Sequence, residues 1–191
     1  MTQSIPLLFQ QRHVLPGGRM PIRIAPGQQM EAFKAALKSC DGFGVCMFDE
    51  AEHGHHFFHI GTRVTVEDFD ISAYDGSLIA TVYGHENFRI NALEQSDDGI
   101  FCGEYEAIPR WPEIKIRNDQ RILAEKLQQM FNKHPELNKL HHEKEFNNLS
   151  WLCQRWLEIL PVPACEKQAL LNAPNCLDTY DYLMSIMQKT H

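Results

Sequence analysis

Four histidines gather in one polar segment of the chain, and their spacing raises the possibility of metal binding; they are His53, His55, His56 and His59. A zinc site needs three or four donors at about 2.0–2.3 Å, and Asp49 or Glu52 could add an oxygen ligand. The alternative is an exposed loop that is rich in histidine. We favour the loop, because strand alternation would send His55 and His56 to opposite sides and no other segment supplies matched ligands. We therefore expect no metal and no cofactor, and keep a metal-binding protein or enzyme as the second hypothesis.

Residues for nucleophilic or phosphate chemistry are also sparse. The chain has no GxSxG motif, and no glycine is followed by lysine, which excludes a P-loop. Six cysteines occur without a CxxC pair. Because the N-terminus lacks a basic region followed by a long apolar run, we expect no export signal and interpret the cysteines as reduced thiols in a cytoplasmic protein. A buried structural role is favoured over a catalytic one for Cys40 and Cys46. The chain is therefore expected not to be an enzyme.

The charge of the chain argues against a nucleic-acid partner. The formal net charge is -7, and no run of Lys and Arg supplies the basic surface that phosphate binding needs. Residues 1–117 hold 16 Asp and Glu against 10 Lys and Arg, which favours basic or neutral peptides over acidic ones. No apolar run is long enough to span a membrane. We expect neither nucleic acid nor membrane as a partner, and the oligomeric state stays open.

Short strand patterns fill the first part of the chain. They recur every 8–12 residues or so and are joined by turns, an arrangement typical of a barrel or sandwich. Asp75-Gly76 predicts a hairpin, and Glu67 and Asp68 are expected to break the strand before it. An amphipathic helix is expected from about Gln28 to Ser39. The expected strands are Ile5–Phe9, Met20–Ile24, Gly42–Phe48, a run that includes Val64, Val66 and Phe69, Leu78–Tyr83, Phe88–Leu93 and Ile100–Ile108.

Helical periodicity replaces the strand pattern after Arg117. An apolar stripe predicts one helix before Pro135, and a second stripe through Leu152 and Trp156 predicts a helix from about Leu137 to Leu160. Two shorter helices should follow Pro163 and Pro174. The predicted class is α+β, with a β-rich lobe over 1–116 and a lobe of about four helices over 117–191.

Four segments in this order resemble the N-terminal, substrate-binding domain of the ATP-dependent protease Lon. They are the turn and strand at Leu15–Ile24, the apolar strand at Phe43–Cys46, the glycine-punctuated hairpin region at Ile60–Ile90, and the helix start at Leu160–Leu171. Together they span nearly the whole chain. The resemblance implies a PUA-like β pseudobarrel with one inserted helix, followed by a helical bundle. Gly61, Gly76 and Gly84 would then set backbone geometry.

The resemblance also implies a function. Lon's ATPase and Ser–Lys protease modules would lie beyond His191, so a stand-alone form is expected. In Lon this domain helps to select protein substrates and contributes to assembly, which implies a non-enzymatic module that recognises polypeptide. The peptide-binding candidates lie around the first turn, and core packing is their alternative role; they are Leu8, Val14, Leu15 and Met20. RNA binding, suggested only by the PUA-like fold, is a weaker third hypothesis.

Overall fold

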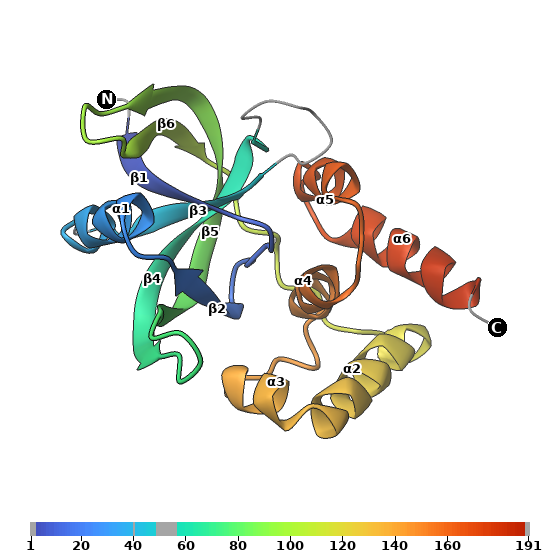
Figure 1. Cartoon of the computed structure of the whole chain (residues 1–191). Helices are drawn as coiled ribbons and strands as arrows, with labels where there is room; N and C mark the ends of the chain where they lie inside the picture. The colour runs from blue at the N-terminus through green and yellow to red at the C-terminus, as the bar shows by residue number, and fades with distance from the viewer. Residues whose placement is uncertain (1–2, 40, 49–56, 190–191) are drawn as a thin grey trace. The chain divides into compact units, whose positions relative to one another are not determined.

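The chain forms two compact units, which meet in sequence between Pro109 and Arg110. A computed structural model describes residues 3–39, 41–48 and 57–189. Within these ranges the first unit holds six strands and one helix (Figure 1), and the second is helical, so the predicted α+β class is confirmed. The first unit consists of β1 (Gln3–Gln10), β2 (Arg19–Ile24), α1 (Gln28–Leu37), β3 (Phe43–Met47), β4 (Ile60–Ile71), β5 (Leu78–Gln95) and β6 (Phe101–Ala107).

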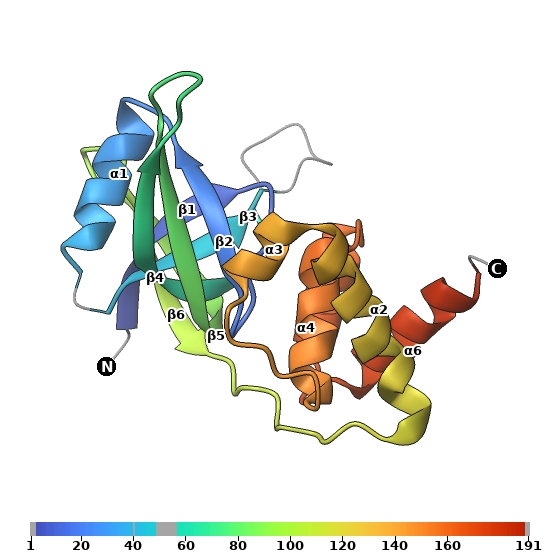
Figure 2. The same cartoon turned by 90° about the horizontal axis from the view of Figure 1, so that it is seen from below.

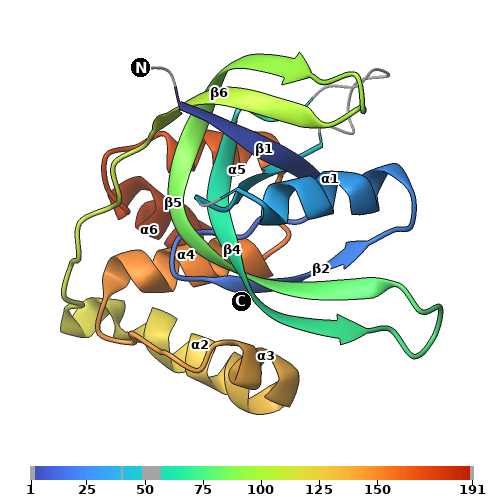
Figure 3. The same ribbon diagram turned by 90° about the vertical axis from the view of Figure 1, so that its left-hand side faces the viewer.

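The strands of the first unit close into a barrel. The sheet order is β2-β5-β4-β3-β1-β6, and a further pairing of β5 with β6 closes the ring of β5, β4, β3, β1 and β6, to which β2 is added on β5 (Figure 3). All neighbours are antiparallel except β1 and β3, which run parallel from Leu7 beside Gly44 to Gln10 beside Met47. The sequence predicted separate strands on either side of Gly84. The prediction was wrong, because β5 continues through this glycine as one strand and pairs with β2 before it and β6 after it.

The first half of β5 belongs to a three-stranded extension of the barrel. Here β5 lies between β2 and the second half of β4. Helix α1, predicted at this position, packs its Phe33 and Ala36 into the core that the extension shares with the barrel. Core partners include Ile22 of β2 and Val82 of β5, both essentially inaccessible to solvent. Removal of this apolar surface from water contributes about 25 cal/mol per Å² and stabilises the packing of α1 against the strands.

β4 extends further than its charged residues suggested. Glu67 and Asp68 were expected to end the strand, but it runs on to Ile71. The register with β5 is irregular at Glu67, and such a bulge twists a strand without ending it. The bulge directs the Glu67 carboxylate to Arg19, whose Nε lies 2.7 Å from Glu67 Oε2. The strand therefore keeps its pairing and its charged residue is neutralised.

The predicted Asp75-Gly76 turn closes the β4–β5 hairpin. Gly76 has φ +69°, a left-handed conformation that glycine adopts without strain. The Asp75 carboxylate accepts hydrogen bonds from the hydroxyl and the amide of Ser77 and forms an ion pair with Arg23. The hydrogen bonds from Ser77, with a smaller contribution from Arg23, lower the pKa of Asp75 to about 2. The turn that the sequence predicted is thus fixed by its own side chains.

The helical unit begins with a short 3-10 turn and continues with five α-helices in the described residues. They are η1 (Asn118–Gln120), α2 (Arg121–Lys133), α3 (Pro135–Leu140), α4 (Leu149–Ile159), α5 (Ala164–Leu171) and α6 (Leu177–Gln188). α4 packs against both α2 and α6 (Figure 2). None of these helices is long and apolar enough to cross a bilayer.

One helix predicted in this unit is two helices in the structure. The sequence predicted a continuous helix from about Leu137 to Leu160, but α3 ends at Leu140 and α4 starts at Leu149. Asn148 caps α4, because its side-chain oxygen accepts a hydrogen bond from Ser150 N at 3.1 Å. An N-cap of this kind satisfies an amide that a continuing helix would bond internally. The count of α-helices is therefore five rather than about four.

Candidate functional site

A groove opens in the first unit where β1 ends, β2 begins and α1 starts. We call it the Phe9 groove, and it encloses about 360 Å³. Its lining combines apolar side chains with three glutamines and one arginine, and contains no carboxylate. The residues are Phe9, Gln10, Gln11, Arg12, Met20, Pro21, Gln29 and Phe48.

Aromatic rings form the apolar wall of the Phe9 groove. The Phe9 ring lies 5.4 Å, between centroids, from each of three rings, those of Phe48, Phe57 and Phe101. Strand pairing brings them together: Phe48 N donates to Gln10 O at 3.2 Å, and Phe48 and Phe57 form an isolated antiparallel bridge. The Phe48 ring remains 44% exposed, so it is accessible from solvent. An exposed ring supported by half-buried rings is a suitable contact for an apolar side chain of a ligand.

The polar wall of the groove offers hydrogen-bonding groups with little charge. Gln29 Oε1 accepts a hydrogen bond from Ala25 N at 2.9 Å, which fixes the orientation of this amide. Arg12 is exposed and supplies the one formal charge of the lining. Amide groups can both donate to and accept from a polypeptide main chain. The groove is therefore suited to a neutral or weakly acidic peptide that carries an apolar side chain.

The four peptide-binding candidates of the sequence are buried. Leu8, Val14 and Met20 belong to the core of the barrel and extension, and Leu15 is fully inaccessible. Thr62 anchors the first-turn segment, because its hydroxyl donates a hydrogen bond to Val14 O at 2.6 Å. Of the four, Met20 also lines the Phe9 groove. The structure thus gives these residues the core packing that the sequence left open as their alternative role.

The histidine segment lies largely outside the described residues. His53, His55 and His56 fall there, whereas the ring of His59 lies 5.3 Å from that of Phe57. In the ranges that the structure describes, no group of three or more His, Cys, Asp or Glu side chains is arranged to hold a metal ion.

The described cysteines differ sharply in accessibility. Cys46 is buried among apolar side chains, and burial raises the pKa of its thiol to about 12. Hydrogen bonding with Cys176 and burial raise the pKa of Cys153. Cys165, in contrast, is exposed on α5. Since the thiolate is the nucleophile, neither Cys46 nor Cys153 is placed for catalysis.

We expect brief alkylation of the folded protein to modify Cys165 and to spare Cys46 and Cys153. Restricted access and a raised thiol pKa both slow the reaction of Cys46 and Cys153 with an alkylating reagent. N-ethylmaleimide treatment at neutral pH, followed by peptide mass spectrometry, measures the modified fraction at each site. The same treatment in denaturant should modify all three. Modification of Cys46 at the rate of Cys165 in the folded protein would contradict the placement of Cys46 in the core.

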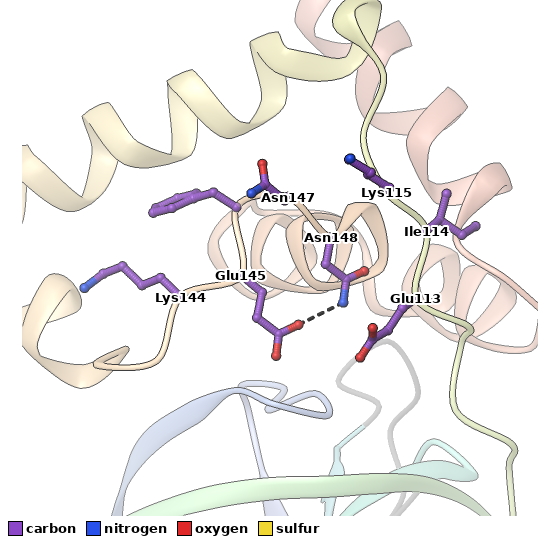
Figure 4. A pocket seen from close by; sticks show the side chains of 8 residues that line it. Glu113, Ile114, Lys115, Lys144, Glu145, Asn147 and Asn148 are labelled. Atoms are coloured by element: carbon purple, nitrogen blue, oxygen red, sulfur yellow. Dashed lines mark hydrogen bonds between the residues drawn. The ribbon is translucent and has the colours of Figure 1, made fainter.

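The helical unit has a hollow of its own, of about 470 Å³, between residues 113–115 and 144–148. Two chain segments meet here, because Ile116 N donates to Asn147 O and Leu149 N donates to Ile114 O. The Asn148 side chain donates to Glu145 at 2.8 Å while it caps α4, and Figure 4 shows the two side chains pointing toward one another. Two lysines and two glutamates line the hollow, namely Lys115, Lys144, Glu113 and Glu145. Because its central amide serves the fold, we assign this hollow a structural role.

Sequence reasoning did not identify the aromatic residues of the Phe9 groove. Phe48 was interpreted as an ordinary strand residue, since it ends the expected strand Gly42–Phe48. Its exposure follows from the parallel pairing of β1 with β3, which places the ends of the two strands side by side. The available signal was the position of Phe9 and Phe48 at the last apolar position of two neighbouring runs.

The closed barrel with its strand extension and inserted helix defines a PUA-like pseudobarrel protein of the α+β class. The chain belongs to the family of the ATP-dependent protease La (LON) substrate-binding domain, whose sequence model matches residues 4–189. Membership assigns the chain a substrate-binding role in general terms.

Solved structures of similar fold include the following two bacterial Lon domains. A Lon N-terminal domain protein from Xanthomonas campestris superposes with a TM-score of 0.73 at 22% identity, over 96% of this chain and 98% of that one. The N-terminal domain of the Mycobacterium avium complex Lon protease gives 0.64 at 19% identity, over 96% and 97% of the two chains. No curated protein matches the sequence. At these identities the likeness establishes the fold alone.

Proposed function

We propose that this protein is a non-catalytic module that binds polypeptide, and that the Phe9 groove receives an apolar side chain of the bound segment. The observation that carries the proposal is the half-exposed Phe48 ring, whose centroid lies 5.4 Å from that of Phe9 at the edge of a wall lined by three glutamines and Arg12. The substrate-binding role of the family supports the same reading.

The chemistry of the groove favours one kind of segment. An aromatic or long aliphatic side chain would pack on Phe48 and Phe9, which removes apolar surface from water on both partners. The glutamines can bond main-chain groups beside that side chain, whatever the sequence. Affinity would then depend on a few apolar residues and tolerate variation between them, as suits a protein that recognises unfolded segments.

Replacing Phe48 with alanine is expected to weaken binding of such a peptide about tenfold, because aromatic contact residues contribute roughly 1–2 kcal/mol. The probe is a neutral, fluorescently labelled peptide with one phenylalanine among serines and glycines, followed by fluorescence anisotropy. An unlabelled, permanently unfolded protein should compete with it.

The control variant is Leu177→Ala. Leu177 is as exposed as Phe48, at 44%, but lies on α6 in the helical unit. The Leu177→Ala variant should bind the labelled peptide with unchanged affinity. Absence of binding up to high micromolar concentration, or equal losses in the two variants, would overturn the proposal.

A further inference from the structure

The second half of β4 is an open sheet edge. β3 pairs with β4 only between Phe43–Val45 and Thr62–Val64, so from Thr65 to Ile71 the described residues provide β4 with a strand partner on one side only, namely β5. Figure 2 shows the β4–β5 hairpin projecting past β3. Unpaired strand edges are templates for a further strand.

Hydrogen-bond alternation identifies which main-chain groups face outward. Ser72 N donates to Ser77 O at 2.8 Å, which makes this a hydrogen-bonded pair of the hairpin. In an antiparallel ladder such pairs alternate with non-bonded ones, so the amides and carbonyls of Phe69 and Ile71 point away from β5. Both amides are bonded instead to the carboxylates of the preceding residues, Asp68 at 2.9 Å and Asp70 at 2.7 Å. These local bonds leave the carbonyls on the open side.

The two faces of this edge differ in chemistry. Because side chains alternate, Phe69 and Ile71 lie on one face and Asp68 and Asp70 on the other. Phe69 is 52% and Ile71 is 68% exposed, and the inner side of the Phe69 ring contacts Phe33 of α1. On the acidic face, neither aspartate has an ion-pair partner among the described residues, whereas nearby Glu67 and Asp75 are paired with Arg19 and Arg23.

We infer that the β4 edge binds an extended polypeptide strand in which basic and apolar residues alternate. The strand would add to β4 by donating main-chain amides to the carbonyls of Phe69 and Ile71. Its basic side chains would lie beside Asp68 and Asp70, and its apolar side chains beside Phe69 and Ile71, because cross-strand neighbours share a face. A second copy of this chain is a poor occupant, since pairing two β4 edges brings like charges together. This edge is separate from the Phe9 groove, so the proposal for either surface can be contradicted without affecting the other.

The test uses a blocked, labelled heptapeptide of alternating lysine and valine, whose affinity is measured by anisotropy at low salt. The double variant Asp68→Asn/Asp70→Asn should weaken binding about tenfold, as expected for two exposed charge pairs. Asparagine keeps an oxygen that can accept from the same amides, so the edge itself is preserved. The control, Asp97→Asn/Asp98→Asn, makes the same charge change in the exposed β5–β6 turn and should have no effect.

Two further peptides separate strand addition from charge attraction. A glutamate–valine peptide should bind at least tenfold more weakly, and N-methylation of alternate amides of the lysine peptide should abolish binding. Phe48→Ala should leave the lysine peptide unaffected, which distinguishes failure here from failure of the groove. Absence of binding of the lysine peptide up to high micromolar concentration, unchanged affinity in the Asp68/Asp70 variant, or equal binding of the N-methylated peptide would overturn the inference.

Discussion

Replacing Gly61 with alanine is expected to lower the free energy of unfolding by about 2–4 kcal/mol, through overpacking in the barrel core. A Cβ at this position would lie 2.5 Å from Cys46 Sγ and 2.8 Å from both Phe88 Cζ and Val45 O. The last of these atoms is backbone of β3 and cannot rotate away. The φ of Gly61 is not positive, so the effect is one of space and not of conformation. Denaturant unfolding followed by circular dichroism measures it.

Phe88 gives this prediction a specific test. Its ring is fully buried and also occupies the space where a Cβ on Gly44 would lie, 2.6 Å from Phe88 Cζ. In the double variant Gly61→Ala/Phe88→Leu, the loss should be smaller than the sum of the single losses by about 1 kcal/mol, because the smaller side chain makes room. The control is Gly76→Asn, at a site with open space and a backbone conformation that asparagine tolerates. A Gly61→Ala protein within about 0.5 kcal/mol of the parent would contradict the packing described.

Replacing Trp156 with alanine should destabilise the helical unit by about 3–5 kcal/mol. The side chain is 4% exposed, and its ring nitrogen donates to Leu123 O at 3.1 Å, which links α4 to α2. Truncation removes both the apolar contact and this hydrogen bond. Denaturant unfolding, with the far-ultraviolet helical signal as readout, measures the effect.

Ile122→Ala is the matched control for Trp156. Ile122 neighbours the bonded Leu123 on α2 but is 38% exposed, so its loss should change stability by less than about 1 kcal/mol. The stability of the Trp156→Phe protein should lie between those of the Trp156→Ala and Ile122→Ala proteins, because phenylalanine keeps most of the packing and loses the hydrogen bond. Equal stability of the Trp156→Ala and Ile122→Ala proteins would show that the indole does not join the two helices.

The parts of the fold that the sequence predicted correctly depend on local chemistry. Asp75-Gly76 defines its hairpin because only the turn residues and their immediate neighbours take part, and the helix from Gln28 follows from apolar spacing alone. The errors arise where contacts between segments that are distant in the sequence determine the local structure. Glu67 looked like the end of a strand, yet Arg19 neutralises it across the sheet. Gly84 looked like a break, but it lies where the first-turn segment crosses β5, with Gly17 N donating to Gly84 O.

The binding surfaces were harder to predict than the fold. Apolar residues near the first turn and apolar residues at strand ends look alike in sequence, and only the pairing of strands decides which become accessible. Val14 is buried by its own hydrogen-bonded turn, whereas Phe48 is left at the surface where β3 ends. The same applies to β4, because nothing in the sequence indicates that β3 stops pairing at Val64. The acidic balance of residues 1–117 predicted basic or neutral peptides over acidic ones, and this preference stays a prediction.

The pairing of β1 with β6 has a consequence for how the protein is made. Gln3 lies beside Tyr105 in this ladder, so the first strand of the unit is completed by the last. Contacts between such distant positions form slowly, because a long stretch of chain must be ordered to close them. A ribosome therefore has to release nearly the whole of the first unit before the barrel can close. Until β6 has been synthesised, one side of β1 lacks its strand partner. During that interval the nascent chain is itself an unfolded polypeptide with an accessible strand.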